Sequence, residues 1–295
     1  MGKAWVLALA MFAALAGPAA AQQQQQQQDP FNGQFGAYEI GFPAREAAHQ
    51  AQLMGDSLAA LHPQRHGHID VYLLVASFWD DPVFQNEATQ AAAILEDHLG
   101  AKDRTIILSA GTGGGNERTY PAATPDNVQA ALGRIGSLID PQEDLVVVFF
   151  TSHGAHDGSI AMLERGRMSG ALRPINLRDG FLQAGIQNRV VILSACFSGA
   201  FVPSLADNNT IIFTAAAQDR TSFGCQPENE WTFFGDAYFN HAIRGGASMV
   251  DAFDRAKVLI EQWETEQHLS PPSNPQHFIG PHAADMLARA EREAH

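Results

Sequence analysis

A histidine and a cysteine each follow an apolar segment of the chain, and together they could cleave an acyl bond. His153 comes after the apolar segment 145–151, and Cys196 comes after the apolar segment 190–194. A cysteine thiolate is a strong nucleophile, and an imidazole that titrates near neutral pH can take up and return a proton. The two residue types therefore predict nucleophilic catalysis by Cys196, with His153 carrying the proton.

These two apolar segments are predicted to be strands of one buried sheet. Segments of strand length that are apolar on both faces lie at 69–77, 105–108, 145–151, 190–194 and 210–214. Helical patterns lie at 43–61, 85–99, 124–139, 176–186, 232–243 and 248–267. This alternation is typical of an α/β fold with a mostly parallel sheet covered on both faces. Since parallel strands bring their carboxyl ends to one edge, we expect His153 and Cys196 at the same edge.

An oxyanion site is expected beside these residues. Gly154 directly follows the histidine and has no side chain, so a substrate could approach its backbone N–H closely. The N–H of Cys196 is the natural second donor for a tetrahedral intermediate.

The two cysteines leave one alternative open. Cys196 and Cys225 are the only cysteines of the chain, and in an exported protein they could form a disulfide. If Cys196 is the nucleophile, Cys225 is expected to be a buried free thiol.

A metal site has little support. His66 with His68, or His153 with His156 and Asp157, could offer ligands, but no further ligand stands at a useful spacing. Surface histidines are the preferred interpretation, and no metal is expected.

The segments around the two residues resemble the legumain-like cysteine peptidases, which are relatives of the caspases. The resemblance is greatest to bacterial members and is carried by VVVFFTSHGA (146–155), VVILSACFSG (190–199), TAAAQDRTSFGC (214–225) and FFGDAY (233–238). It implies a caspase-like three-layer sandwich, a mostly parallel central sheet flanked by helices, hydrolysis of peptide bonds, and no metal or organic cofactor. His153 and Cys196 match the catalytic dyad of the family, and Gly154 matches its oxyanion glycine.

The chain also departs from the family pattern. The family has an acidic residue two positions before the cysteine, where this chain has Ser194. Its basic specificity residues are replaced by Gln85 and Asn86, whereas the acid that matches Asp236 is retained. Catalysis is therefore better supported than a preference for asparagine.

The primary pocket is expected beside Cys196. The segment after the strand 210–214 should wall it, through Ala215, Ala216 and Ala217, and the resemblance implies Asp236 as its polar anchor. A carboxylate without a basic neighbour repels an acidic side chain, so asparagine, lysine or arginine is expected before the cleaved bond.

The charge of the chain excludes one class of partner. Eighteen basic and 32 acidic residues give a formal net charge of −14. Such a protein repels phosphate backbones, so nucleic acid is not expected as a partner and peptide or protein substrates are.

The amino-terminal residues predict export to the periplasm or the exterior. Residues 1–21 combine Lys3, a short apolar run and small residues at the end, the pattern of a signal peptide. No stable membrane anchor is expected after cleavage. A glutamine tract at 22–28, an extension at 29–67, one peptidase domain at 68–281 and a tail at 282–295 complete the predicted organisation.

Three functions remain open on the sequence alone. The leading hypothesis is a cysteine endopeptidase. A transamidase or peptide ligase would use the same dyad with an amine in place of water, and a catalytically silent binding protein would use the same scaffold.

Overall fold

The computed structural model describes residues 43–112, 115 and 117–295. The predicted signal peptide at 1–21 and glutamine tract at 22–28 lie outside these residues. No described helix is both long enough and apolar enough to cross a membrane.

The centre of the fold is a six-stranded sheet with the order β2-β1-β3-β6-β7-β8. Its strands are β1 (Val71–Ser77), β2 (Thr105–Ser109), β3 (Leu145–Thr151), β6 (Arg189–Ser194), β7 (Thr210–Thr214) and β8 (Gln276–Ile279). Every neighbouring pair is parallel except β7 with β8, so the predicted mostly parallel sheet is confirmed.

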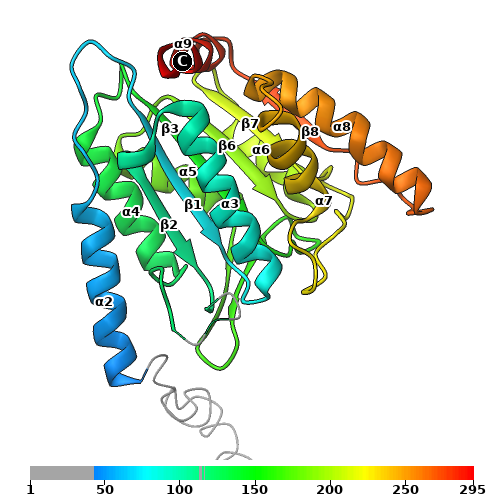
Figure 1. The fold of residues 1–295 in the computed structure, drawn as a ribbon, viewed down its shortest axis with the longest axis horizontal. Coiled ribbons are helices and arrows are strands. Elements are labelled where there is room, and N and C mark those ends of the chain that lie inside the picture. Colours follow the sequence, from blue (N-terminus) through cyan, green and yellow to red (C-terminus); the bar gives the residue numbers. More distant parts are fainter. Residues whose placement is uncertain (1–42, 113–114, 116) are drawn as a thin grey trace, which may run out of the picture. The chain divides into compact units, whose positions relative to one another are not determined.

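Helices cover both faces of this sheet, as Figure 1 shows. One face is packed by α3 (Pro82–Leu99), η3 (Asp236–Ile243), α8 (Met249–Glu266) and α9 (Pro281–Ala294). The other is packed by α2 (Ala44–Ala59), α4 (Pro125–Leu138), α5 (Pro174–Ala184) and α6 (Val202–Leu205). Successive residues of a strand point to opposite faces, so Leu73 and Val75 enter the first core while Tyr72 and Leu74 enter the second. The predicted three-layer α/β sandwich is therefore confirmed.

Shorter elements connect these layers. They are η1 (Lys102–Arg104), the antiparallel hairpin of β4 (Ile160–Glu164) and β5 (Met168–Leu172), η2 (Ser198–Phe201) and α7 (Phe233–Gly235). The hairpin and α5 form the connection that carries the chain from β3 to β6.

The sequence predicted some helix starts more accurately than others. The side chain of Thr124 accepts a hydrogen bond from Asn127 N at 3.2 Å, and Pro125 is the first residue of α4, one residue after the start of the helical pattern predicted at 124–139. By contrast, α3 begins at Pro82 and not at Gln85, because proline also fits the first turn of a helix. Strand β8 was not predicted, since its four residues are too short to give a pattern.

Helices α4 and α5 cross where Gly136 faces Ala184. A Cβ atom on Gly136 would overlap the carbonyl oxygen of Ala184. Gly133, on the same helix, has open space around it. Replacement of each glycine by alanine therefore tests a different effect, close packing at Gly136 and helix propensity at Gly133.

We expect Gly136→Ala to lower the free energy of unfolding by about 1–3 kcal/mol, because the helices must separate. Gly133→Ala should instead raise it by about 0.5–1 kcal/mol through helix propensity. Urea unfolding followed by circular dichroism measures both. Equal stabilisation by the two variants would contradict the close crossing.

Candidate active site

The parallel pairing of β3 with β6 brings the two predicted catalytic residues to one edge of the sheet. Thr151 and Ser194 are register partners at the ends of these strands. His153 and Cys196 each lie two residues beyond this pair. Ser152 N donates to Ser194 O at 3.1 Å, which continues the pairing to the point where the strands end.

Gly154 lies against the backbone of Cys196. A Cβ atom built on Gly154 would overlap Cys196 O and would lie 3.1 Å from Cys196 N, so only glycine fits without a shift. Neither the N–H of Gly154 nor that of Cys196 donates a hydrogen bond to another described residue. Two neighbouring backbone donors are therefore available at the end of the sheet.

The sulfur of Cys196 is held by the loop that follows β7. Ser222 N donates to Cys196 Sγ at 3.3 Å, and Ser222 Oγ lies 3.6 Å from the same sulfur. The next residue, Phe197, has φ 59°, and its N–H donates to Arg220 O at 2.8 Å. A positive φ is uncommon for a large residue, and such conformations concentrate at functional sites. Sequence patterns did not identify Ser222, because it lies in a loop without periodicity.

The imidazole of His153 is packed between aromatic rings. Trp79 and Phe84 contact it edge-on, with ring centroids 4.7 and 5.0 Å away. Within the described part of the chain, its ring nitrogens form no hydrogen bond. Burial lowers the pKa of His153 below its usual value of 6.5; the charge of Asp81 opposes this shift and that of Arg165 adds to it. The imidazole is therefore favoured in its neutral form, which can accept a proton.

Asp81 positions the tryptophan that packs on His153. Its carboxylate accepts from Trp79 Nε1 at 3.0 Å and from Arg165 at 2.7 Å. Leu163 of the β4–β5 hairpin donates its N–H to Phe78 O at 2.7 Å, beside Trp79. In addition, Ala161 N donates to His153 O at 2.9 Å. The hairpin thus holds both the histidine and the loop that carries its aromatic neighbour.

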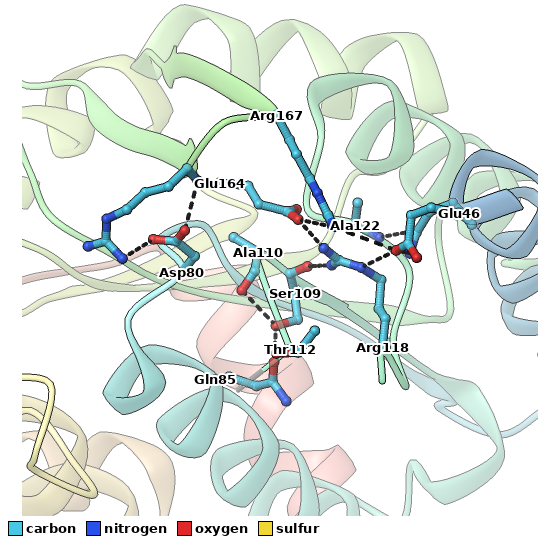
Figure 2. Close-up of polar contacts among 12 residues, drawn as sticks. Glu46, Asp80, Gln85, Ser109, Ala110, Thr112, Arg118, Ala122, Glu164 and Arg167 are labelled. Carbon is cyan, nitrogen blue, oxygen red and sulfur yellow. Dashed lines mark hydrogen bonds and ion pairs between the residues drawn. The ribbon is translucent and has the colours of Figure 1, made fainter. Parts of the chain in front are cut away.

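A buried ion-pair cluster anchors the far end of this hairpin, as Figure 2 shows. Arg118 is 5% exposed and pairs with Glu164, the last residue of β4, and with Glu46 of α2. Arg167 also contacts Glu164, at 2.7 Å. Removing one partner of such a cluster leaves an uncompensated charge and typically costs about 3–5 kcal/mol. The cluster therefore ties α2, the loop after β2 and the hairpin together.

Cys225 is a free thiol, as is Cys196. Burial raises the pKa of Cys225, and a negative charge on Cys196 would raise it further. Cys225 is therefore a free thiol as expected, but it is half-buried and not fully buried, and its thiol is favoured in the neutral form.

The residues predicted to bind substrate do not line one cavity together with Cys196. Asp236 lines a cavity of about 440 Å³ with Thr232 and Trp231, and Cys196 is not among its lining residues. Ala215, Ala216 and Ala217 are buried, with Gly199 packed against the last two. Their role in substrate binding remains a prediction.

Two positions at which the chain departs from the legumain-like pattern form hydrogen bonds with neighbouring side chains. Gln85 accepts a hydrogen bond from Ser109 Oγ at 2.6 Å, as Figure 2 shows. Ser194 donates to Oε1 of Glu87 on α3, at 3.2 Å. Glu87 was not identified from the sequence, although a charged residue on the apolar stripe that includes Ala91 and Leu95 was a usable signal.

Comparison with known proteins identifies the family. The model of the Peptidase C13 family matches residues 116–279, more than half of the chain. The chain therefore belongs to the Peptidase C13 family, the legumain family, and the resemblance predicted from the sequence is confirmed at that level.

The crystal structure of caspase-1 from Spodoptera frugiperda is similar with a TM-score of 0.49 and 10% sequence identity, over 75% of this chain and 94% of that one. No match was found among the curated proteins.

The charges around His153 generate a prediction about its titration. Asp81→Asn removes a charge that raises the pKa of His153, so that pKa should fall further; Arg165→Gln removes one that lowers it, so the pKa should rise. NMR titration of histidine-labelled protein, with His153→Ala for assignment, measures both. Arg178→Gln, at an exposed residue of α5 paired with Asp179, is the control and should leave the titration unchanged. Shifts in the same direction for both variants would contradict this electrostatic arrangement.

Proposed function

We propose that the protein is a cysteine endopeptidase in which Cys196 is the nucleophile and His153 is the general base and acid. Membership of a peptidase family supports the reaction class. The observation that carries the assignment of residues is the fit of Gly154 against the backbone of Cys196. This contact brings the strand end of His153 beside that of Cys196 and leaves two backbone N–H groups free between them.

The reaction follows from these groups. His153, favoured in its neutral form, takes the proton of the Cys196 thiol, and the thiolate attacks the peptide carbonyl carbon. The carbonyl electron pair moves to oxygen, where the N–H groups of Gly154 and Cys196 bind the oxyanion. As the intermediate collapses, the C–N bond breaks and His153 protonates the leaving amine. Water then gives a proton to His153 and attacks the thioester carbon; the C–S bond breaks, the carboxylic acid leaves, and His153 returns the proton to the sulfur.

The contact with Ser222 supports the first step. An N–H that donates to Cys196 Sγ at 3.3 Å stabilises negative charge on the sulfur and fixes its direction. The rings of Trp79 and Phe84 hold the imidazole without using its nitrogens. Both nitrogens therefore remain available to the thiol and to the leaving amine.

Cys196→Ala and His153→Ala should each lower kcat by at least about 1000-fold, because each removes a group that acts in every turnover. Cleavage of a quenched fluorogenic peptide library, with cleavage sites read by mass spectrometry, measures the loss. Thermal unfolding close to that of the wild type shows that the fold is retained. Wild-type activity in the Cys196→Ala variant would overturn the proposal.

Gly154→Ala should also lower kcat by at least about 100-fold, because the added methyl group displaces the backbone donors of the oxyanion site. Gly170→Ala on β5, where a Cβ atom has open space, is the matched control and should retain wild-type activity. If Gly154→Ala keeps the wild-type kcat, the oxyanion site lies elsewhere.

A further inference from the structure

Glu87 is a buried carboxyl group that the reaction above does not use. It lies on α3 with 0% of its surface exposed. It forms no ion pair with any described residue. Its oxygens accept hydrogen bonds from three hydroxyl groups instead: Thr151 on Oε2, and Thr232 at 2.8 Å and Ser194 at 3.2 Å on Oε1. We refer to these four residues as the Glu87 cluster.

The three donors lie at the points that set the geometry of the dyad. Thr151 is the last residue of β3, and Ser194 is the last residue of β6. Each stands two residues before His153 or Cys196. Thr232 precedes α7 and also accepts a hydrogen bond from Gly235 N at 3.1 Å. One carboxyl group therefore joins both catalytic strand ends to a helix start.

The carboxyl group is closely confined. A Cβ atom on Gly235 would overlap Oε1 of Glu87, and the nearest atoms to it all belong to the Glu87 side chain. Ser194 and Thr232 also contact each other, with 3.0 Å between their hydroxyl oxygens. The group therefore cannot move without breaking contacts to the strand ends.

Burial of the Glu87 carboxylate costs free energy that its three hydrogen bonds offset only in part. Burial raises the pKa of Glu87 to about 7; the hydrogen bonds from Thr151, Thr232 and Ser194 oppose this shift, and the negative charge of Asp236 adds to it. The other titratable neighbour is Cys225, whose pKa is raised in part by Glu87. A buried carboxyl group with no cationic partner is costly, and such groups concentrate at functional sites.

We propose that Glu87 is a positioning residue of the peptidase, which fixes the β3 and β6 strand ends and thereby holds His153 and Cys196 in their reactive arrangement. The inference rests on the proposed catalytic function of these two residues. The carboxylate can accept from all three hydroxyl groups at once. A protonated carboxyl group must donate to one of them, which reverses that hydrogen bond and loosens the attachment of one strand end.

Ionisation of Glu87 should therefore appear in the reactivity of Cys196. The test uses the full chain with Cys225→Ser, so that Cys196 is the only thiol that iodoacetamide can alkylate. The alkylation rate and the kcat and KM on a fluorogenic peptide are measured from pH 5 to 9. In the parent protein, we expect an inflection near pH 7 in addition to that of His153.

Glu87→Gln keeps the size of the side chain but not its charge. At pH 8 we expect kcat to fall about tenfold with KM within about twofold, and the inflection near pH 7 to disappear. Thr151→Val should change kcat in the same direction, because it removes one donor and keeps the shape. Thr151→Ser, which retains the hydroxyl group, should restore most of the activity. If Glu87→Gln does not fold, the comparison of Thr151→Val with Thr151→Ser tests the positioning role of Glu87.

The matched control is Asp144→Asn at the opposite end of β3. Asp144 is also a buried carboxyl group; burial raises its pKa to about 6, and it accepts backbone N–H groups of Asp70 and Asp140. Its replacement should alter the pH dependence of unfolding and leave the alkylation profile of Cys196 unchanged.

Two failures can be told apart. Activity that persists in Cys196→Ala would overturn the proposed function. If activity requires Cys196 but Glu87→Gln and Thr151→Val keep the parent kcat and pH profile, Glu87 has no positioning role. A change of profile in Asp144→Asn equal to that in Glu87→Gln would also overturn the inference, because it would show a general effect of stability.

Discussion

The parallel pairing of β3 with β6 is the constraint on which the rest of the site depends. The two strands run in register from Val146 with Arg189 to Thr151 with Ser194. A shift by one residue would move Cys196 along its strand by about 3.3 Å relative to His153. Gly154 could then no longer lie against the Cys196 backbone, and the two free N–H groups would separate. Chemistry at the end of the sheet is thus set by hydrogen bonds within it.

The supports around this pairing differ in their electrostatics. On the side of the β4–β5 hairpin, Arg118, Glu164, Arg167 and Glu46 neutralise one another. On the side of α3, the donors to Glu87 among the described residues are all hydroxyl groups. The first arrangement holds the hairpin through ion pairs between opposite charges. The hydrogen bonds to Glu87 change when this residue is protonated, because its hydroxyl donors do not neutralise the buried charge of the carboxylate.

The strands that carry His153 and Cys196 were predictable because each is an apolar segment of sufficient length. His153 and Cys196 were identified because each lies two residues beyond the end of such a segment. The residues that support His153 and Cys196 were not identified from the sequence, for physical reasons. Ser222 acts through its backbone N–H, which any residue type except proline possesses. The partners Arg118 and Glu164 meet only when the hairpin folds back towards the loop after β2. Glu87 violates the apolar pattern of its helix, and the pattern alone does not reveal what compensates it.

The distances along the chain within the Glu87 cluster bear on when this cluster can be completed during folding. The donors follow Glu87 by 64, 107 and 145 residues. Contacts between residues so far apart along the chain require the intervening segments to be brought together, which carries an entropic cost. During synthesis, α3 leaves the ribosome before Thr151, Ser194 and Thr232, so the set of three donors is complete only after Thr232 has been made. On the proposed role of Glu87, the arrangement of His153 and Cys196 is therefore completed only after five of the six strands of the central sheet have been synthesised.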